Sequence, residues 1–256
     1  MKQIIFRALS FLLGSVNYKL VSKNNFLEIN LQKINKKKNK DYKLSIENFL
    51  DYLFSLKSQS KSQIFQDLFV DYVFKQKKSF FYCEVGAADG IKFSNTFFLE
   101  KQRRWKGILC EPSLHWREKI KKNRPNNILI FDPISNKSSE RLFYENDNNF
   151  LSGLEPGTQK STKSYKVNTV TLNNIFLKYK VKNIDYLSID VEGHEISVLQ
   201  GLNFTRYRPK VISIEHNYIQ KKKIHKILSA LNYNLVFPCL SRFDSFYVCK
   251  DFFRKI

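Results

Sequence analysis

Residues 81–90, FYCEVGAADG, join a short apolar run to a loop of small residues. Glycine at 86 and 90 and alanine at 87 let the backbone pass close to a ligand, at the start of a helix that would follow the loop. The apolar run is short enough for a buried strand. This order of strand, small-residue loop and helix predicts a nucleotide-type binding loop and an α/β fold built around it.

The acidic residue of this loop distinguishes between classes of cofactor. The dinucleotide fingerprint GxGxxG would need glycine where Ala88 stands, and Asp89 would place a carboxylate against a pyrophosphate. S-adenosylmethionine carries an ammonium and a sulfonium and has no phosphate, so an acid beside it is favourable. We therefore expect this cofactor, with Gly86, Ala87, Asp89 and Gly90 as candidate binding residues.

A second acid follows the next apolar run, at Glu111-Pro112. A carboxylate about twenty residues beyond such a loop is placed to accept hydrogen bonds from both ribose hydroxyls of a cofactor. Either acid alone is more typical of a helix N-cap. The two together, in the order strand, loop, helix, strand, favour a cofactor pocket.

Outward from this loop, short apolar runs alternate with segments of helical length, which is typical of α/β proteins. Continuous apolar runs predict parallel strands with helices on both faces of the sheet. Only PCLSRFD separates the last two runs, so we expect an antiparallel hairpin there. The seven runs are residues 79–85, 107–112, 126–132, 184–190, 210–216, 233–237 and 246–249.

Residues 1–57 differ from the rest and predict a helical, lysine-rich extension before a domain of residues 58–256. The run Lys33–Lys43 reads as a solvated helix end or linker. The segment 58–78 opens with serines suited to an N-cap and predicts a helix that includes Ile64 and Leu68.

The composition bears on partners and location. The formal net charge of +21 draws the chain toward anions, but 34 of its 44 cations are lysine, so codon bias explains it better than nucleic-acid recognition. The four cysteines form no CxxC pair and predict reduced thiols in a cytoplasmic protein. Ile4–Leu13 is too short to span a bilayer, although the basic N-terminus is suited to weak peripheral contact with an anionic membrane.

From about Ser62 to Phe246 the chain resembles the FkbM-type S-adenosylmethionine-dependent methyltransferases. The resemblance implies a class I methyltransferase Rossmann-like fold and this cofactor. Ala88 departs from the family's frequent asparagine, and Pro133 from its frequent alanine near the adenine. The matching pieces are SQIFQDLFV, FYCEVGAADGIKFSNTFFLEK, WKGILCEPS, NFLSGL, VNTVTLNNIF, IDYLSIDVEGHEISVLQG and KVISIEHN.

The resemblance also implies roles for single residues. By it, Glu84, Gly86 and Asp89 line the methionine end of the cofactor, and Glu111 binds its ribose. Pro112 and Asp132, at the ends of the second and third runs, complete our candidates for cofactor binding.

Two further polar clusters follow the fourth and fifth runs, at DVEGHE (190–195) and EHN (215–217). Since the carboxyl ends of parallel strands form the ligand cleft, both clusters should face the transferred methyl group. The catalytic candidates are Asp190, Glu192, His194 and His216. A helix N-terminus stabilised by acids, a solvated His194 and a core His216 are the competing structural interpretations.

Transfer of a methyl group to a hydroxyl needs one base near the cleft, for which Asp190 and His216 are the candidates. A second option is that Asp190 with Glu215 or Asn217 resembles the oxygen ligands by which some O-methyltransferases hold Mg²⁺. A divalent cation is therefore an open alternative, and no residue is assigned to a metal from the sequence.

The expected function is O-methylation of a small-molecule or carbohydrate acceptor, and the acceptor class rests on the family resemblance alone. The alternatives are an N- or C-methyltransferase and a non-catalytic basic module that binds nucleic acid or anionic lipid. No motif predicts specific nucleic-acid binding. Residues 146–165 are rich in loop-forming residues, and we expect a lid over the site there.

Overall fold

The computed structural model describes residues 44–146, 149–154 and 161–255. The chain divides into two compact units, residues 1–57 and 58–256. The described part of the first unit contains helix α3 (Ile46–Leu56), which begins where the hydroxyl of Ser45 accepts the N–H of Asn48. A 3₁₀ turn, η1 (Lys57–Gln59), follows it. The predictions for Ile4–Leu13 and Lys33–Lys43 lie outside the described residues.

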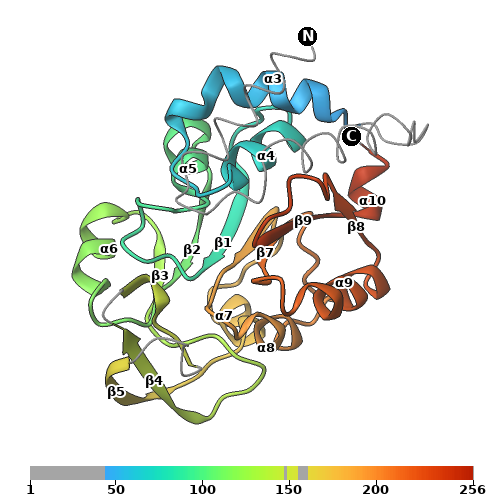
Figure 1. The fold of residues 1–256 in the computed structure, drawn as a ribbon. Coiled ribbons are helices and arrows are strands. Elements are labelled where there is room, and N and C mark those ends of the chain that lie inside the picture. The colour runs from blue at the N-terminus through green and yellow to red at the C-terminus, as the bar shows by residue number, and fades with distance from the viewer. Residues whose placement is uncertain (1–43, 147–148, 155–160, 256) are drawn as a thin grey trace, which may run out of the picture. The chain divides into compact units, whose positions relative to one another are not determined.

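The second unit is built on a seven-stranded sheet in the order β3-β2-β1-β6-β7-β9-β8 (Figure 1). The first five of these strands are parallel, and β9 runs antiparallel to both β7 and β8. The predicted parallel sheet with a C-terminal antiparallel hairpin is thus confirmed. The strands are β1 (Phe81–Val85), β2 (Lys106–Cys110), β3 (Ile128–Ile130), β6 (Tyr186–Ile189), β7 (Val211–Glu215), β8 (Tyr233–Val236) and β9 (Asp244–Cys249).

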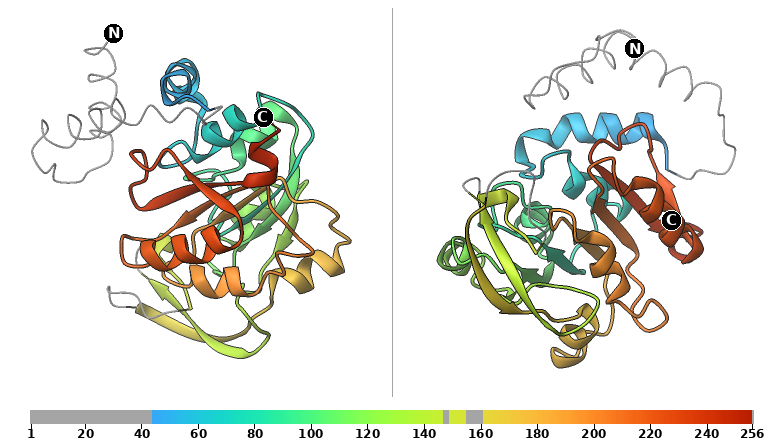
Figure 2. Two further views of the ribbon diagram at one scale, coloured as in Figure 1. Left: turned by 90° about the vertical axis from the view of Figure 1, so that its right-hand side faces the viewer. Right: turned by 60° about the horizontal axis from the view of Figure 1, so that its bottom comes forward.

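Helices cover both faces of this sheet, as Figure 2 shows. The face that carries Cys83 and Val85 packs with residues of α7, α8 and α9 in one apolar core. On the opposite face α4 lies against β9, where the rings of Phe69 and Phe246 stack with their centroids 4.6 Å apart. The helices are α4 (Gln66–Val73), α5 (Phe97–Arg103), α6 (Arg117–Asn123), α7 (Leu172–Lys178), α8 (Glu195–Gln200), α9 (Lys221–Ala230) and α10 (Lys250–Phe253).

Helix α4 begins later than the serine pattern predicts. It starts at Gln66, after Phe65 in the left-handed region at φ 63°, so Ile64 lies outside the helix. The hydroxyls of Ser60 and Ser62 do not cap the helix, because they donate to the buried carboxylate of Asp67, at 2.6 and 2.7 Å.

A two-stranded antiparallel sheet was missing from the prediction. Strands β4 (Glu140–Asn146) and β5 (Ser161–Asn168) pair beside the main sheet, with a 3₁₀ turn η2 (Asn149–Leu151) between them. The expected loop 146–165 is therefore too long, since residues 161–165 belong to β5. The sequence of β5, STKSYKVN, has no apolar run, so its pairing with β4 leaves no hydrophobic pattern to read.

None of the helices in the described ranges is long and apolar enough to cross a membrane. Cys83, Cys110 and Cys249 are buried and Cys239 is half-buried, and none of the four forms a disulfide.

Candidate functional site

The predicted site residues gather at the carboxyl ends of the parallel strands β1, β2, β6 and β7. The loop 86–90 follows β1, Glu111 follows β2, and the segment 190–195 follows β6. Glu215 is the last residue of β7. Since this edge is where ligands bind in open α/β sheets, the topology brings all of these segments to one side of the domain.

Gly86 joins the loop after β1 to the end of β6. Its φ is +90°, and a Cβ atom there would lie 1.7 Å from the carbonyl oxygen of Asp190. The N–H groups of Gly86 and Ala87 both donate to the carbonyl of Cys110, at 2.9 and 3.2 Å. The loop is therefore fixed between the ends of β2 and β6, directly beside Asp190.

Asp89 is half-buried and shapes the second half of the loop. Its Oδ1 accepts the N–H groups of Ile91 and Lys92, at 2.8 and 2.7 Å, so the side chain closes a local turn. Asn123 donates to the carbonyl of Asp89 from α6, at 2.7 Å. A contact between the Asp89 carboxylate and the cofactor stays a prediction.

Glu84 points into the protein, where it is 1% exposed. Its carboxylate accepts the hydroxyls of Ser94 and Thr96, at 3.0 and 2.5 Å, and the N–H of Asn95, at 2.6 Å. These bonds hold the segment between the loop and α5. The structure thus accounts for Glu84 without a ligand, and its predicted contact with the cofactor is not tested.

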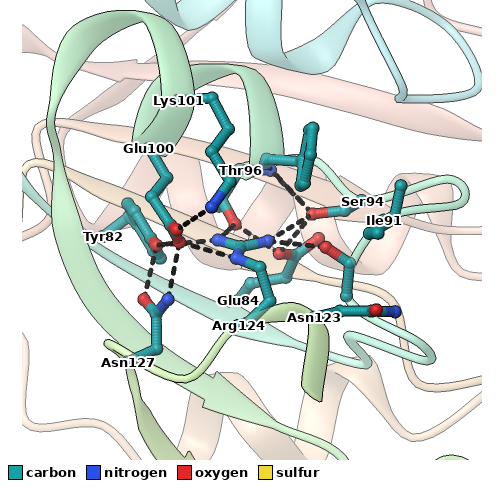
Figure 3. A network of polar contacts seen from close by, with 12 residues as sticks. Tyr82, Glu84, Ile91, Ser94, Thr96, Glu100, Lys101, Asn123, Arg124 and Asn127 are labelled. Carbon is teal, nitrogen blue, oxygen red and sulfur yellow. Dashed lines mark hydrogen bonds and ion pairs between the residues drawn. The ribbon is translucent and has the colours of Figure 1, made fainter. Parts of the chain in front are cut away.

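Arg124, which was not among the residues predicted from the sequence, is the centre of a buried network that reaches the loop after β1 (Figure 3). Its guanidinium donates to Glu100 at 2.6 Å, to Tyr82 at 2.7 Å and to the carbonyl of Gly90 at 2.8 Å. In the sequence Arg124 stands before Pro125, at the expected end of a helix. An arginine at such a position is usually solvated, so the sequence does not mark it as buried.

Glu111 is buried at the end of β2 and contacts the loop after β1. Its Oε2 accepts the N–H of Ala88 at 2.7 Å, and its Oε1 accepts the N–H of Ser113 at 2.9 Å. Burial raises the pKa of Glu111 to about 7 against the effect of these two bonds, and the charges of Glu145 and Asp190 act in the same direction as burial. Each oxygen retains a lone pair for a further donor.

The other two cofactor candidates at this edge are less enclosed. Pro112 is half-buried next to Glu111, and Asp132 is exposed, two residues beyond the end of β3. Their contacts with a cofactor stay predictions.

Three carboxylates converge where β6 and β7 end. One oxygen each from Asp190, Glu192 and Glu215 lies within 4.8 Å of the other two. Glu195 and Asp244 act electrostatically on this group. We call these five residues the acidic cluster. The sequence singled out Asp190, Glu192 and Glu215 but not Asp244, which lies opposite Glu215 across the pairing of β7 with β9.

Burial and like charge shift the pKa values of the cluster in one direction. Burial, followed by the charge of Glu195, raises the pKa of Asp190 to about 7. Burial, followed by the charge of Asp190, raises the pKa of Glu192 to about 8. The same two causes raise the pKa of Glu215 strongly. The cluster therefore favours binding of protons or of a cation.

The backbone after β6 turns sharply to present Glu192. Glu192 has φ +53° and Gly193 has φ +103°. Oε1 of Glu195 accepts the N–H groups of Val191 and Gly193, at 3.2 and 2.9 Å. A non-glycine residue in the left-handed region is sterically costly, so these bonds hold a conformation that the chain would otherwise avoid.

The two histidines are buried and bonded inside the protein. Nε2 of His194 lies 2.9 Å from the hydroxyl of Ser135. Nδ1 of His216 accepts the N–H of Tyr218 at 2.9 Å, and its Nε2 lies 3.3 Å from Ser241 Oγ. Burial, followed by the charge of Lys221, lowers the pKa of His216 to about 4. These contacts favour a structural role for both imidazole rings. The carboxylates are therefore the stronger candidates for catalysis.

Comparison with known families gives a match over most of the domain. The family model described as "Methyltransferase FkbM domain" matches residues 84–235, more than half of the chain. The chain belongs to the FkbM methyltransferase family. The match begins inside β1 and ends inside β8. A search of curated proteins gave no match.

Solved structures similar to this FkbM domain share little sequence with it. Methyltransferase FkbM from Methylobacillus flagellatus KT is 12% identical, with a TM-score of 0.45, and the match covers 67% of this chain and 43% of that one. Precorrin-6y C5,15-methyltransferase from Geobacter metallireducens GS-15 is 10% identical, with a TM-score of 0.39 and coverage of 66% and 71%. A TehB-like SAM-dependent methyltransferase from Corynebacterium glutamicum is 8% identical, with a TM-score of 0.39 and coverage of 80% and 97%.

The residues at the strand ends fit S-adenosylmethionine, the cofactor of such a methyltransferase domain. Glu111 offers two buried acceptor oxygens to a ribose diol. It lies 23 residues beyond Ala88, whose N–H it accepts. The acidic cluster lies beside the same loop through the contact of Gly86 with Asp190. Negative charge on both sides of the loop suits the ammonium and sulfonium of this cofactor and opposes binding of a phosphate.

Proposed function

We propose that this FkbM domain transfers a methyl group to a hydroxyl oxygen of a small-molecule or carbohydrate acceptor. The observation that carries the proposal is the contact between Gly86 and Asp190. It sets the acidic cluster directly against the loop 86–90, our candidate for cofactor binding. An acceptor bound next to both would lie beside the methyl group and a set of carboxylates.

Each part of the chain has a distinct task in this reaction. The bound cofactor supplies a methyl group on a positively charged sulfur. The loop 86–90 holds the methionine end of the cofactor, and Glu111 holds its ribose. The acidic cluster positions the acceptor hydroxyl and accepts its proton, for which a pKa of about 7 at Asp190 is well matched to neutral pH.

The atom that is methylated distinguishes this proposal from its alternatives. A neutral amine attacks through its free lone pair without a base, whereas an alcohol hydroxyl is a weak nucleophile until its proton is removed. Methyl transfer to a hydroxyl oxygen therefore needs a group that removes this proton, and the carboxylates can do so. The cluster therefore favours an oxygen acceptor over nitrogen.

The test uses the full chain, a cell extract as the source of acceptors, and cofactor labelled with ¹³C in the methyl group. Mass spectrometry should detect a product that gains one labelled methyl, and the carbon chemical shift should identify it as bound to oxygen. Asp190→Asn should lower the rate. Glu118→Gln, at a side chain that is 81% exposed on α6, is the matched control and should leave the rate unchanged.

Two results would contradict the proposal. A labelled methyl bound to nitrogen or carbon would replace O-methylation with one of the alternatives. Failure of the chain to bind the cofactor in a calorimetric titration would favour a non-catalytic binding module instead.

A further inference from the structure

We propose that Asp190, Glu192 and Glu215 form a binding site for one hard divalent cation of the magnesium class. The three side chains come from the ends of two adjacent strands, β6 and β7, and one oxygen of each lies within 4.8 Å of the others. Two oxygens bound to one cation at about 2.0 to 2.6 Å are separated by at most about twice that length. A separation within 4.8 Å satisfies this limit for the longer metal–oxygen bonds of the range, and a small closure of the side chains would satisfy it for Mg²⁺.

A second, independent observation concerns Glu215. This residue is 7% exposed, and its Oε2 has no hydrogen-bond partner among the described residues. Asp190 and Glu192 place further carboxyl oxygens around it, and burial of these acidic groups together disfavours their charged forms unless they share a proton or a cation. A cation at this point would satisfy Oε2 and use the neighbouring oxygens at the same time.

Asp244, next to the three proposed ligands, also has a buried carboxylate oxygen without a hydrogen-bond donor among the residues that the structure describes. It is 1% exposed, and its Oδ1 has no partner in the described part of the chain. Its Oδ2 accepts the side-chain amide of Gln66 at 2.8 Å, which fixes the carboxylate in place. Two buried oxygens without donors in one cluster indicate that a positive group belongs there.

Among the described residues, lysine and arginine side chains do not supply the positive charge that the acidic cluster lacks. The chain has 44 lysine and arginine residues against 23 acids. Within the described ranges, the ion pairs join other acids, and none includes a member of the acidic cluster. Concentrating five carboxylates without a cationic side chain is costly unless they share protons or bind a cation.

The ligand set defines the kind of ion. Three carboxylates and no sulfur or imidazole favour Mg²⁺, Mn²⁺ or Ca²⁺ over Zn²⁺ or copper. The site itself follows from the residues above, whereas the role of the ion rests on the proposed function. A cation here would refine one step of the proposed function: it would coordinate the acceptor hydroxyl and lower its pKa, and the proton would then leave to water instead of to the carboxylates that hold the ion.

The test measures binding of Mn²⁺ to the full chain by electron paramagnetic resonance, with Mg²⁺ as competitor. We expect one Mn²⁺ per chain, displaced by Mg²⁺. Asp190→Asn and Glu215→Gln keep the side-chain volume and should each weaken Mn²⁺ binding by about tenfold or more. Glu118→Gln removes an exposed acid on α6 and should bind as the wild type does.

A thermal unfolding series keeps the result interpretable if a variant is altered in stability. Mn²⁺ should raise the melting temperature of the wild type, and this rise should be absent in Asp190→Asn and Glu215→Gln, which should still unfold cooperatively. The site is overturned if the wild type binds no Mn²⁺ at millimolar concentration, or if both variants bind it as tightly as the wild type.

The two proposals fail separately. If Mn²⁺ binds as expected but the labelled methyl reaches nitrogen or carbon, the cation site stands and O-methylation does not. If an O-methyl product forms at an unchanged rate in protein that binds no Mn²⁺, O-methylation stands and the cation site does not.

Discussion

The guanidinium of Arg124 donates a hydrogen bond to the backbone carbonyl of Gly90, 2.8 Å away. A residue at the end of α6 therefore holds the last position of the loop that follows β1. The packing is close, since a Cβ atom on Gly90 would lie 2.6 Å from Cγ of Arg124. Arg124, which is fully buried, therefore fixes the end of the loop 86–90.

Arg124→Met should be strongly destabilising. It keeps much of the apolar volume but leaves Glu100 and the buried Glu84 without their cation. Breaking a buried ion pair from one side costs about 3 to 5 kcal/mol. Urea unfolding measures the change. Lys121→Met, which breaks an exposed pair with Glu118, is the control and should cost about 1 kcal/mol or less.

The same network predicts how stability depends on acid. Burial acts to raise the pKa of Glu100, but the charge of Arg124 and hydrogen bonds from Lys101, Asn127 and Arg124 lower it to about 2. A lowered folded-state pKa stabilises the protein above the unfolded value, about 4.5, and this contribution is lost as the pH falls toward 2. The wild type and Glu100→Gln should therefore differ less in their free energy of unfolding as the pH falls over that range. A difference that is constant with pH would contradict the assignment.

Gly86→Ala and Gly193→Ala separate steric conflict from backbone strain. Both glycines have positive φ, but a Cβ at 86 would lie 1.7 Å from Asp190 O, whereas a Cβ at 193 meets nothing within 4 Å. Gly193→Ala should cost about 1 to 2 kcal/mol from its conformation alone. Gly86→Ala should cost about 4 kcal/mol or more, because the end of β6 must also move. Equal losses in chemical denaturation would show that the contact with Asp190 does not matter.

The fold could be predicted where the chain has a periodic or contiguous apolar pattern. All seven strands of the main sheet are apolar runs bounded by loops, so their number, their order along the chain and the terminal hairpin could be predicted. β5 could not, because a polar strand paired only with β4 has no buried face to mark it. Similarly, Ser60 and Ser62 look like helix caps, but their partner is the side chain of Asp67.

The sequence predicts which site residues meet only where those residues lie at the ends of strands. Asp190, Glu192 and Glu215 meet because the ends of parallel strands meet. Arg124 and Asp244 depend on contacts between segments far apart in sequence, which no local pattern reveals. The inward direction of Glu84 and the occupied ring nitrogens of His216 likewise depend on side-chain partners rather than on position along a strand.

Removal of residues 1–57 should leave cofactor binding intact. The FkbM match at 84–235 and the compact unit 58–256 both lie outside that segment. Calorimetry on the full chain and on residues 58–256 should give the same affinity for S-adenosylmethionine. Circular dichroism of the shorter chain provides the control for folding, and an unfolded spectrum would show that the domain boundary is wrong.

Affinity for the cofactor should depend on pH through Glu111. In the predicted pocket the ribose hydroxyls would donate to the ionised carboxylate of Glu111, whose pKa is raised to about 7 by burial in spite of its two backbone N–H bonds. The ionised fraction grows as the pH rises through 7, so the dissociation constant should fall from pH 6 to pH 8 and then level off. Loss of this charge-assisted pair costs about 1.5 to 3 kcal/mol, or about ten- to a hundredfold in affinity.

Glu111→Gln provides the decisive comparison, because the amide keeps the size of the side chain but cannot ionise. At pH 8 it should bind the cofactor about ten- to a hundredfold more weakly than the wild type, and its affinity should vary less with pH. Calorimetric titrations of both proteins at several pH values measure the two slopes. Because Glu111 also accepts the N–H groups of Ala88 and Ser113, thermal unfolding must show that the variant is folded. A folded variant with wild-type affinity at pH 8 would remove Glu111 from the ribose site and leave the loop 86–90 as the main determinant of cofactor binding.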